Sequence, residues 1–473
     1  MPVPVITIAQ MRDWENATWS TGQTEAEVIR LVGESVARHA LRLSRPGDLI
    51  VILAGKGHNG EDARSARAYL ADRRVDVLDI LEPSAALSKL ETLLSLRPAL
   101  VIDGLFGIGI NRPLSPEWVQ FIERVNTARA SVLAVDVPSG LNADTGAPEG
   151  AAIHALVTLT VGAPKIGLLQ QTAWPFVGRL EVATDVGLVP CPHTNEVMWT
   201  LAEDFNDYPP ARTAATHKGS YGHLAILAGS VGFHGAAVLA ARGAQRAQPG
   251  LITLHTLEPV YHVIASQLQA VMVSPSLPAP RVTGSFSAFL VGPGFAAADA
   301  AELVSTNARH LWRDSPLPVV VDASGLDWLP VEPATPSTSL RVITPHPGEA
   351  ARLLRSNIEQ IQSNRLNSLR QVSKRFGNAW VVLKGHQTLI GRTAGEVYVN
   401  SSGNPHLAQG GSGDVLAGYL AALLAQPALR ADPLKTIRFA VWQHGAAADY
   451  LQATRPNWVV EDLVEMLGNI STH

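Results

Sequence analysis

In the stretch Asn404-Pro405-His406-Leu407-Ala408-Gln409-Gly410-Gly411-Ser412-Gly413-Asp414-Val415-Leu416-Ala417-Gly418, a glycine-rich loop runs directly into an apolar helical pattern. A helix N-terminus offers unpaired backbone N–H groups and the positive end of the helix dipole. Glycines let that backbone close on a phosphate without interference from a Cβ atom. A carboxylate in this place, Asp414, suits a base that takes a proton from a hydroxyl attacking phosphorus. The alternative interpretation is a glycine-rich N-cap that has no chemistry.

The chain has 473 residues, which is too long for one ordinary hydrophobic core, so we expect two domains. Short, continuous apolar runs typical of buried strands alternate with helical segments, which predicts an α/β fold with parallel sheets covered on both faces. In the first half a helical segment is expected at 8–45, a helix at 62–70, and strands at 49–53, 75–80, 100–103, 132–136 and 155–161. In the second half the expected strands are 224–228, 251–255, 289–292, 319–322, 341–344 and 380–383. The pattern loosens around residues 190–215, so we expect domains at 1–204 and 205–473.

Composition and charge exclude several classes of protein. The chain is 46% apolar and 16% charged with a net charge of -4, and its lysines and arginines form no long run. This argues against nucleic acid as the main partner, because binding a phosphate backbone needs a basic face. The single cysteine, Cys191, excludes a disulfide framework and a thiolate metal cage. Without a signal-like start or an apolar run near 18 residues, we expect a cytoplasmic protein that does not enter membranes.

Five glycine- or carboxylate-bearing turns follow predicted strands in the second half of the chain. Open α/β sheets bind ligands at the carboxyl ends of their strands, so these turns are expected to meet at one site. A single turn of this kind is usually only a turn, whereas five in order predict a binding site. The turns begin at Ala228-Gly229-Ser230, Val291-Gly292-Pro293-Gly294, Thr344-Pro345-His346-Pro347-Gly348-Glu349, Leu383-Lys384-Gly385-His386-Gln387-Thr388 and Gly410-Gly411-Ser412-Gly413-Asp414.

This order of motifs resembles the ribokinase-like superfamily and, within it, the ADP/ATP-dependent NAD(P)H-hydrate dehydratases. The resemblance covers nearly all of residues 205–470, and the turn His346-Pro347-Gly348-Glu349 distinguishes these enzymes from sugar and vitamin kinases with the same Gly-x-Gly-Asp loop. One departure is Ser324 in Asp322-Ala323-Ser324-Gly325-Leu326, where the family usually shows a second aspartate. The matching segments are His217-Lys218-Gly219-Ser220-Tyr221-Gly222, Gly292-Pro293-Gly294, Thr344–Glu349 and Gly403–Leu416.

The resemblance implies a substrate, a reaction and a set of site residues. The substrate is NADH or NADPH hydrated at C6 of the nicotinamide ring, and Asp414 deprotonates the C6 hydroxyl. The resulting alkoxide attacks the terminal phosphate of ADP or ATP with Mg²⁺ present, and phosphate then leaves. The nucleotide is expected at Lys384, Gly385, His386, Gln387, Thr388, Gly411, Ser412 and Gly413, and the hydrate at Ala236, Gly294, His346 and Asp414.

Three turns at strand ends also mark the first half of the chain, at Gly55–Asp62, Asp103–Pro113 and Asp136–Leu141. Glycine loops that open helices suit a pyrophosphate. Their aspartates, asparagine and serine form an oxygen-rich set of the kind that binds a hard cation. The alternative interpretation is that Asp103 and Asp136 only cap the turns that follow them.

These turns resemble the NAD(P)H-hydrate epimerase domain, a Rossmann-like domain often fused ahead of the dehydratase in bacteria, over about residues 8–200. The resemblance implies a potassium ion held by Asn59, Asp103 and Ser139. It leaves open whether Asp136 or Asp103 is the acid and base of epimerisation. The chain departs from the family at His58, Glu61 and Ala63 of the first loop and at Arg30. The implied hydrate contacts are His58, Asn59, Gly60, Glu61 and Asp62, then Gly107, Ile108, Gly109, Ile110, Asn111, Arg112 and Pro113, and Asp136.

Together the resemblances predict a bifunctional enzyme that acts on a small molecule and forms a homo-oligomer. The epimerase would interconvert the R and S hydrates, and the dehydratase would convert the S form to NAD(P)H with release of AMP and phosphate. One alternative is a small-molecule kinase that uses Asp414 in the same way. Another is an N-terminal domain that only binds or oligomerises.

Overall fold

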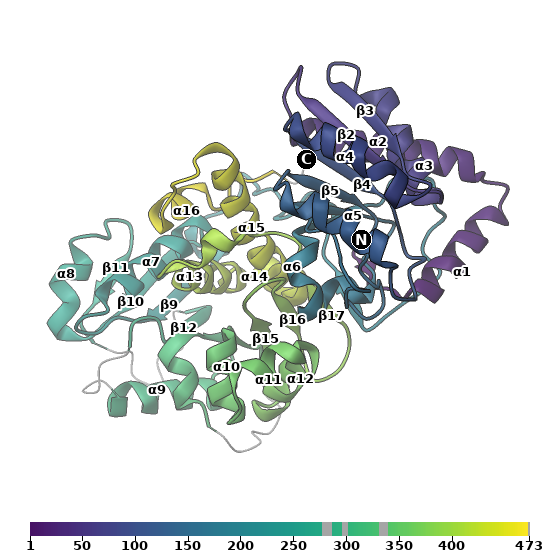
Figure 1. Ribbon diagram of the computed structural model, residues 1–473. Coiled ribbons are helices and arrows are strands. Elements are labelled where there is room, and N and C mark those ends of the chain that lie inside the picture. Colours follow the sequence, from purple (N-terminus) through teal and green to yellow (C-terminus); the bar gives the residue numbers. More distant parts are fainter. Residues whose placement is uncertain (277–285, 296–300, 331–338, 472–473) are drawn as a thin grey trace. The chain divides into compact units, whose positions relative to one another are not determined.

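The computed structural model describes residues 1–276, 286–295, 301–330 and 339–471. The chain forms two compact units, an N-terminal unit of Val3–Asn195 and a C-terminal unit of Glu196–His473 with which Met1 and Pro2 group (Figure 1). Strand β8 (Val197–Trp199) pairs with β17 (Val397–Val399) in the sheet of the C-terminal unit, so the compact units divide before β8. The domain assignment to 1–204 and 205–473 stays a prediction.

The N-terminal unit is built on a parallel sheet whose strands run in the order β3-β2-β4-β5-β6-β7. Helices α1, α2 and α3 cover one face of this sheet, and α4 (Pro83–Ser95) and α5 (Pro116–Thr127) cover the other. Because both faces are buried, the central strands are largely apolar, as the sequence predicted, although β4 ends in Asp103-Gly104. The strands are β2 (Leu49–Ala54), β3 (Arg74–Asp79), β4 (Leu100–Gly104), β5 (Val132–Val135), β6 (Val157–Val161) and β7 (Arg179–Ala183).

The helical segment expected at 8–45 is confirmed for most of its length but is interrupted once. Two helices, α1 (Ile8–Trp19) and α2 (Glu25–Arg42), are separated by a turn in which Gly22 has a φ of 91°. Positive φ favours glycine and ends a helix, and Thr24 then caps α2 by accepting a hydrogen bond from the Glu27 N–H. The helix expected at 62–70 begins earlier, as α3 (His58–Ser65), and continues as a 3₁₀ turn at Ala66–Tyr69.

From β8 onward, the sheet of the C-terminal unit runs in the order β8-β17-β16-β15-β14-β13-β12-β9-β10-β11. Strand β16 is antiparallel to both of its neighbours, and the other pairings are parallel. The expected central strands are confirmed, with ends displaced by a residue. The strands not yet bounded are β9 (His223–Leu227), β10 (Leu251–His255), β11 (Met272–Ser274), β12 (Ala288–Val291), β13 (Val319–Val321), β14 (Arg341–Ile343), β15 (Trp380–Leu383) and β16 (Leu389–Gly391).

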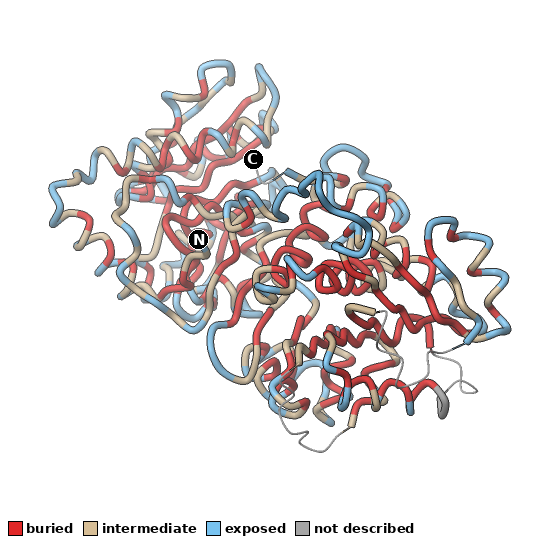
Figure 2. The backbone as a smooth tube through the Cα atoms, turned by 180° about the vertical axis from the view of Figure 1, so that it is seen from behind, coloured by how far each residue is buried: buried red, intermediate tan, exposed pale blue. Residues whose placement is uncertain are grey.

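Helices cover both faces of this sheet as well. Side chains of α7 (His234–Arg246), α13 (Ser412–Ala425) and α15 (Pro433–Thr454) share one core with the strands. Those of α9 (Ala301–Asp314), α10 (Pro347–Leu354) and α12 (Arg365–Arg375) share the core on the opposite face. Figure 1 shows the two helical layers, and Figure 2 shows the buried strands between them. The remaining α-helices are α6 (Trp174–Val177), α8 (Tyr261–Ala265), α11 (Ile358–Ser363), α14 (Pro427–Arg430) and α16 (Val460–Met466).

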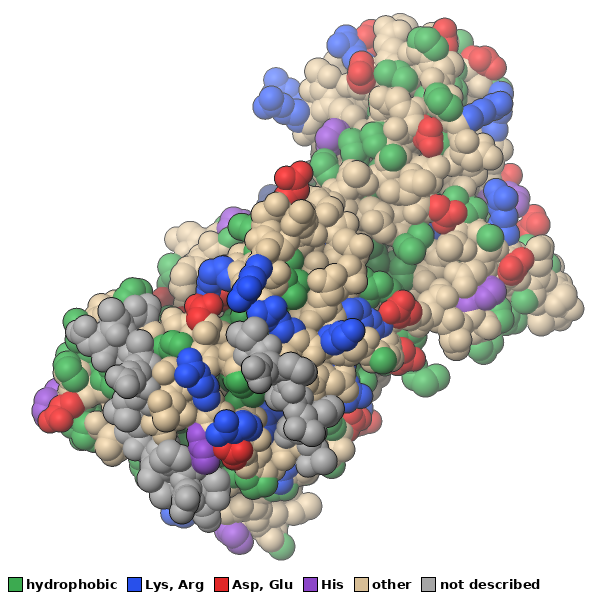
Figure 3. All heavy atoms as spheres, turned by 90° about the horizontal axis from the view of Figure 1, so that it is seen from below, with side chains coloured by type: hydrophobic (Ala, Val, Ile, Leu, Met, Phe, Trp, Pro, Cys, Tyr) green, Lys and Arg blue, Asp and Glu red, His purple; other side chains and the backbone are tan. Residues whose placement is uncertain are grey.

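The surface carries charged side chains of both signs, scattered among uncharged ones on the face drawn in Figure 3. Among the described residues, no helix is both long enough and apolar enough to cross a bilayer.

Candidate active sites

Helix α13 begins at the carboxyl edge of the C-terminal sheet, behind the glycine loop. Its N-cap, Gly411, has a φ of 96°, a conformation that side chains disfavour. Nε2 of the buried His444 lies 3.0 Å from the carbonyl oxygen of Ser412. Burial lowers the pKa of His444 to about 4, so the neutral ring donates this hydrogen bond at pH 7. His444 of α15 therefore fixes the position of the first turn of α13.

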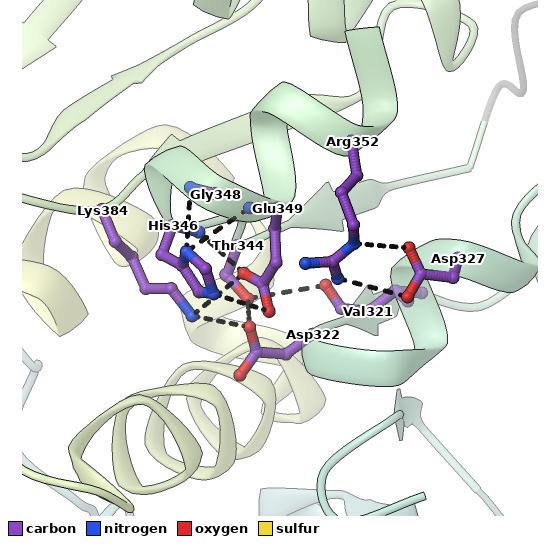
Figure 4. A network of polar contacts seen from close by, with 9 residues as sticks. All are labelled: Val321, Asp322, Asp327, Thr344, His346, Gly348, Glu349, Arg352 and Lys384. Atoms are coloured by element: carbon purple, nitrogen blue, oxygen red, sulfur yellow. Dashed lines mark hydrogen bonds and ion pairs between the residues drawn. The ribbon is translucent and has the colours of Figure 1, made fainter. Parts of the chain in front are cut away.

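Beside that helix start, a lysine is held between two buried carboxylates (Figure 4). Lys384 Nζ lies 2.8 Å from Asp322 Oδ1 and 3.9 Å from Glu349 Oε2. The hydroxyl of Thr344 donates a hydrogen bond of 2.7 Å to the same Asp322 oxygen. Burial alone would lower the pKa of Lys384, but Asp322 and then Glu349 raise it above its usual value. Lys384 is therefore a cation at neutral pH.

Asp414 lies in the first turn of α13, close enough to this network to feel its charges. Burial, and then the charges of Asp322 and Glu349, raise the pKa of Asp414 to about 7, while Lys384 lowers it. A carboxylate with a pKa near the working pH is well matched to the task of a general base. Gly413 completes the arrangement, because a Cβ atom on it would lie only 3.3 Å from Lys384 Nζ. Because Gly413 has no side chain, its backbone is open to a ligand.

The turn at His346 is fixed by reciprocal capping of α10. Nδ1 of His346 accepts a hydrogen bond of 3.0 Å from the Gly348 N–H, and Glu349 Oε2 accepts one of 2.7 Å from the His346 N–H. Because Nδ1 is an acceptor, the ring proton is on Nε2, 3.5 Å from Glu349 Oε1. The ring itself is exposed, so its outer edge is free to meet a ligand.

The buried Arg365 fixes the backbone of the loop Lys384–Thr388 by hydrogen bonds. Its guanidinium donates hydrogen bonds to the carbonyl oxygens of Leu383 (3.1 Å), Lys384 (3.4 Å) and His386. Gly385 and Gln387 have φ values of 127° and 51°, so the loop turns sharply and its outer face is left to solvent or ligand. A fixed loop that begins with a lysine suits the binding of a nucleotide phosphate.

The expected hydrate residues Ala236 and Gly294 are neighbours, although they follow different strands. A Cβ atom on Gly294 would lie 3.1 Å from Ala236 Cβ and 2.4 Å from the Phe233 carbonyl oxygen. The structure thus brings together the ends of β9 and β12 on one side, and Lys384, His346 and Asp414 on the other, at the same edge of one sheet.

A cavity of about 950 Å³ lies in the N-terminal unit, all of whose residues the structure describes. Of the residues expected to contact a ligand there, Gly60 and Glu61 do not line it. Gly60 is buried against the backbone of Gly55, and Glu61 is exposed on α3. The expected residues that line the cavity are His58, Asn59, Asp62, Gly107, Ile108, Gly109, Ile110, Asn111, Arg112, Pro113 and Asp136.

Asp136 lines this cavity and is paired with a buried lysine that the sequence did not single out. Lys165 Nζ lies 2.5 Å from Asp136 Oδ1 and donates a further hydrogen bond of 2.8 Å to the Val161 carbonyl oxygen. Asp136 Oδ1 also accepts from the Val161 N–H at 3.1 Å. Asp136 has a φ of 63°, a backbone conformation typical of constrained sites.

Asp103 lies deeper and does not line the cavity. Its carboxylate accepts hydrogen bonds from the Ser139 hydroxyl (2.6 Å), the Ser139 N–H (2.8 Å) and the Leu105 N–H (3.2 Å). Burial raises the pKa of Asp103 to about 6, against these hydrogen bonds. Next to it, Asn59 donates to the Phe106 carbonyl oxygen at 2.8 Å, while its own Oδ1 is buried without a hydrogen-bond partner.

The residues of the two candidate sites that sequence reasoning missed are Asp322, Glu349 and Arg365 in the C-terminal unit, and Lys165 and the cavity-lining Glu15 in the N-terminal unit. Asp322 and Glu349 stand in quoted motifs at strand ends, so their position could have marked them as site residues. Lys165 follows strand β6 by a short turn and gave the same signal. Glu15 and Arg365 lie on helices, where no local pattern distinguishes them from surface charges.

The fold of the C-terminal unit and its charged, glycine-bounded site define a ribokinase-like enzyme. The family described as NAD(P)H-hydrate dehydratase matches residues 224–470, and the family described as YjeF-related protein N-terminus matches residues 79–167. The C-terminal unit is similar to the ADP/ATP-dependent NAD(P)H-hydrate dehydratase of Bacillus subtilis co-crystallised with ATP and Mg²⁺, at 28% identity and a TM-score of 0.50. That match covers 57% of this chain and 95% of the other.

Two full-length relatives extend the comparison to both units. The bifunctional NAD(P)H-hydrate repair enzyme Nnr of Gloeobacter violaceus is 33% identical, over 95% of this chain and 94% of that protein. The enzyme of the same name from Coxiella burnetii is 30% identical over 93% of each chain. This chain belongs to the family of bifunctional NAD(P)H-hydrate repair enzymes.

Proposed function

We propose that the chain restores hydrated NADH and NADPH by two activities, epimerisation in an N-terminal domain (1–204) and ADP-dependent dehydration in a C-terminal domain (205–473). The observation that carries the dehydratase assignment is the position of Asp414 at the start of α13, between a Cβ-free backbone and the Lys384 ammonium. A cytoplasmic location and a homo-oligomeric assembly stay predictions.

In dehydration, Asp414 takes the proton of the C6 hydroxyl as that oxygen attacks the terminal phosphorus of ADP. The N–H groups of Gly411, Ser412 and Gly413 stabilise the charge that develops on the phosphoryl oxygens, and one such donor typically contributes roughly 3–4 kcal/mol in the transition state. Lys384 adds a fixed positive charge. Phosphate then leaves C6 with the bonding electron pair, and C5 loses a proton to the departing phosphate, so that the C5=C6 double bond of the dihydronicotinamide ring is restored. AMP is the other product.

The residues present fit a nucleotide phosphate and a divalent cation. A Cβ atom on Gly413 would crowd Lys384 Nζ, so the glycine leaves the backbone there open to a phosphate. The loop Lys384–Thr388 lies beside it. Asp322 and Glu349 supply oxygen atoms of the kind that Mg²⁺ prefers, directly or through water. Bound Mg²⁺ would neutralise phosphate charge. His346, Ala236 and Gly294 would hold the hydrate at the same sheet edge, and ATP would serve in place of ADP as donor.

In epimerisation, the hydrate occupies the N-terminal cavity and Asp136 faces its ring. Loss of the C6 hydroxyl, assisted by the ring nitrogen, leaves a cation that a carboxylate stabilises. Asp136 suits this role because it lines the cavity and is oriented by Lys165, whereas Asp103 is buried outside it. We therefore favour Asp136 over Asp103 as the residue next to the reacting carbon.

A potassium ion fits the oxygen set behind the cavity wall. Asn59 Oδ1 is buried without a partner, and Asp103, Ser139 and the Phe106 carbonyl oxygen lie in one hydrogen-bonded group beside it. Carboxylate, hydroxyl, amide and carbonyl oxygens are ligands that suit a hard cation better than a softer transition metal. Bound K⁺ would supply a positive charge next to the pyrophosphate.

The test mixes purified R and S hydrates of NADH with the whole chain, ADP, Mg²⁺ and K⁺. The proposal predicts that NADH absorbance returns and that both isomers disappear on chromatography. A small-molecule kinase would instead give a stable phosphorylated product and no NADH. An N-terminal domain without catalysis would leave the R hydrate behind, apart from slow spontaneous epimerisation.

A further inference from the structure

Two carboxylates in the N-terminal cavity stand without partners. Glu15 of α1 and Asp62 of α3 both line the cavity, as does Asp136. Both side chains are only partly exposed, and within residues 3–195, which the structure describes throughout, neither carboxylate has a hydrogen-bond or ion-pair partner. Asp136, in contrast, is bound by Lys165 at 2.5 Å. An unpaired, half-buried carboxylate is costly, so two of them in one cavity indicate a use for them.

The carboxylates of Glu15, Asp62 and Asp136 also interact electrostatically. Burial first, and then the charge of Asp136, raises the pKa of Glu15, while Lys165, His58 and Arg12 lower it. Burial first, and then Asp136, Glu61 and Glu15, raises the pKa of Asp62 well above its usual value. Carboxyl groups that interact in this way tend to hold one proton between them, so that one is an acid while the other is a base.

The cavity wall has a second mark of ligand binding, at the place proposed above for the potassium ion. Asn59, which lines it and is 9% exposed, has its Oδ1 buried without a hydrogen-bond partner. Arg112 and the glycines 107 and 109 form another part of the wall, where a phosphate group would find a cation and an open backbone. The acidic group therefore lies in a cavity that is also equipped to bind an anionic nucleotide.

We propose that Glu15 and Asp62 are the catalytic acid and base of epimerisation, with Asp136 stabilising the cation between them; the inference rests on the epimerase activity proposed above. The protonated member gives its proton to the C6 hydroxyl, the C6–O bond breaks with its electron pair on oxygen, and water departs. The ring is then a planar iminium cation. A water molecule adds to the opposite face, and its proton passes to the ionised member. The two carboxyl groups exchange roles at each turnover, and no other reactant is consumed.

This reaction exchanges the C6 oxygen with solvent, which gives a direct readout. Purified R-NADH hydrate is incubated with the whole chain in heavy-oxygen water with K⁺ and without ADP, and label and isomer ratio are followed together. Glu15→Gln and Asp62→Asn should each slow both signals by roughly 10²-fold or more, the usual contribution of an acid–base group. Asp13→Asn, an exposed neighbour on the same helix, is the matched control. Circular dichroism and a thermal melt of each variant, compared with the unaltered chain, verify that the N-terminal unit is folded.

The outcomes separate this inference from the proposed function. If the unaltered chain speeds isomer exchange and both variants keep the rate of the Asp13→Asn control, Glu15 and Asp62 are not the acid and base. If only one variant keeps that rate, the pair is equally overturned. If the unaltered chain does not exceed the spontaneous rate, the epimerase function fails first and this inference with it. Glu15→Asp, which keeps the carboxyl group, should recover part of the lost activity.

Discussion

The ammonium of Lys384 lies 2.8 Å from the carboxylate of Asp322, 62 residues away in the sequence. The two residues follow β15 and β13, which flank β14 in the sheet, so their strand ends face the same edge. Together with Glu349 they form a buried group of one ammonium and two carboxylates next to Asp414. Burial first, and then the charges of Asp322 and Glu349, raise the pKa of Asp414, while the charge of Lys384 lowers it.

Removing the charge of Asp322 and removing the charge of Lys384 should move the pH profile of dehydration in opposite directions. If Asp414 is the base proposed above, kcat/KM should fall about tenfold per pH unit below its pKa of about 7. Asp322→Asn removes a charge that raises this pKa, so the profile should move to lower pH. Lys384→Met removes a charge that lowers it, so the profile should move to higher pH. Rates measured over a pH series with both variants check this, and shifts of the same sign would contradict it.

The same pair should contribute to stability. Lys384→Met leaves Asp322 and Glu349 buried without their cation, which typically costs about 3–5 kcal/mol in the free energy of unfolding. Denaturant titration of the variant measures this loss. The double variant Lys384→Met with Asp322→Asn removes both charges and should be more stable than Lys384→Met alone. A double variant that is less stable would show that the pair is not the cause.

Asp414 should make the protein less stable as the pH rises. Its pKa is raised from 3.8 to about 7 by folding, so between these values the folded chain binds more protons than the unfolded chain. Stability from this group is present below pH 3.8 and is lost as the pH rises through 7. Asp414→Asn does not titrate and should gain Tm relative to the unaltered protein across this interval. Calorimetry at several pH values checks the trend, and a constant difference in Tm would refute it.

The close packing of α13 on α7 should be intolerant of a methyl group. A Cβ atom on Gly418 would lie 1.9 Å from the carbonyl oxygen of Ala240, so the helices would have to separate. Gly418→Ala should cost about 1–3 kcal/mol by overpacking. Gly235→Ala in α7, where nothing lies within 4 Å, is the control and should be neutral or slightly stabilising. Equal Tm values for the two variants would rule out the close contact.

Potassium should stabilise the N-terminal unit through Asn59. A ligand at 100 times its Kd adds about 2.7 kcal/mol to the folded state. Tm should therefore rise when Na⁺ is exchanged for K⁺ at constant ionic strength, and Asn59→Ala should remove most of the rise. Thr92→Ala, an exposed site on α4, keeps the rise and serves as the control. An Asn59→Ala protein with an unchanged response would place the ion elsewhere.

The sequence predicted both sheets because their central strands are continuous apolar runs, such as Leu49–Leu53, and buried parallel strands need that composition. It did not predict β16 or β17, which are three residues long and depend on their neighbours in the sheet, β16 on β15 and β17 on β16 and β8. The break after Trp19 was missed because apolar positions continue at helical spacing on both sides of the turn. Helical periodicity reports which face is buried and is insensitive to a short interruption.

The sequence indicated His346 and Lys384 by their turns at strand ends and Asp414 by its glycine loop at a helix start, and the family resemblance implied their roles. The structure brings the three residues to one sheet edge. The partners of these residues depend on which strands are neighbours, a property of topology that local sequence does not contain. Glu15 is the extreme case, since it lies on a helix far in sequence from Asp62 and Asp136, and only the folded cavity brings the three together.

The most direct test of the whole account uses Asp414→Asn with a mixture of R and S hydrates, ADP, Mg²⁺ and K⁺. The account predicts that NADH formation falls by at least about 10²-fold, the scale of a lost general base. It also predicts that the R and S isomers still interconvert at the rate of the unaltered protein, because that reaction occurs in the other unit. Undiminished NADH formation, or loss of both activities in a folded variant, would contradict it.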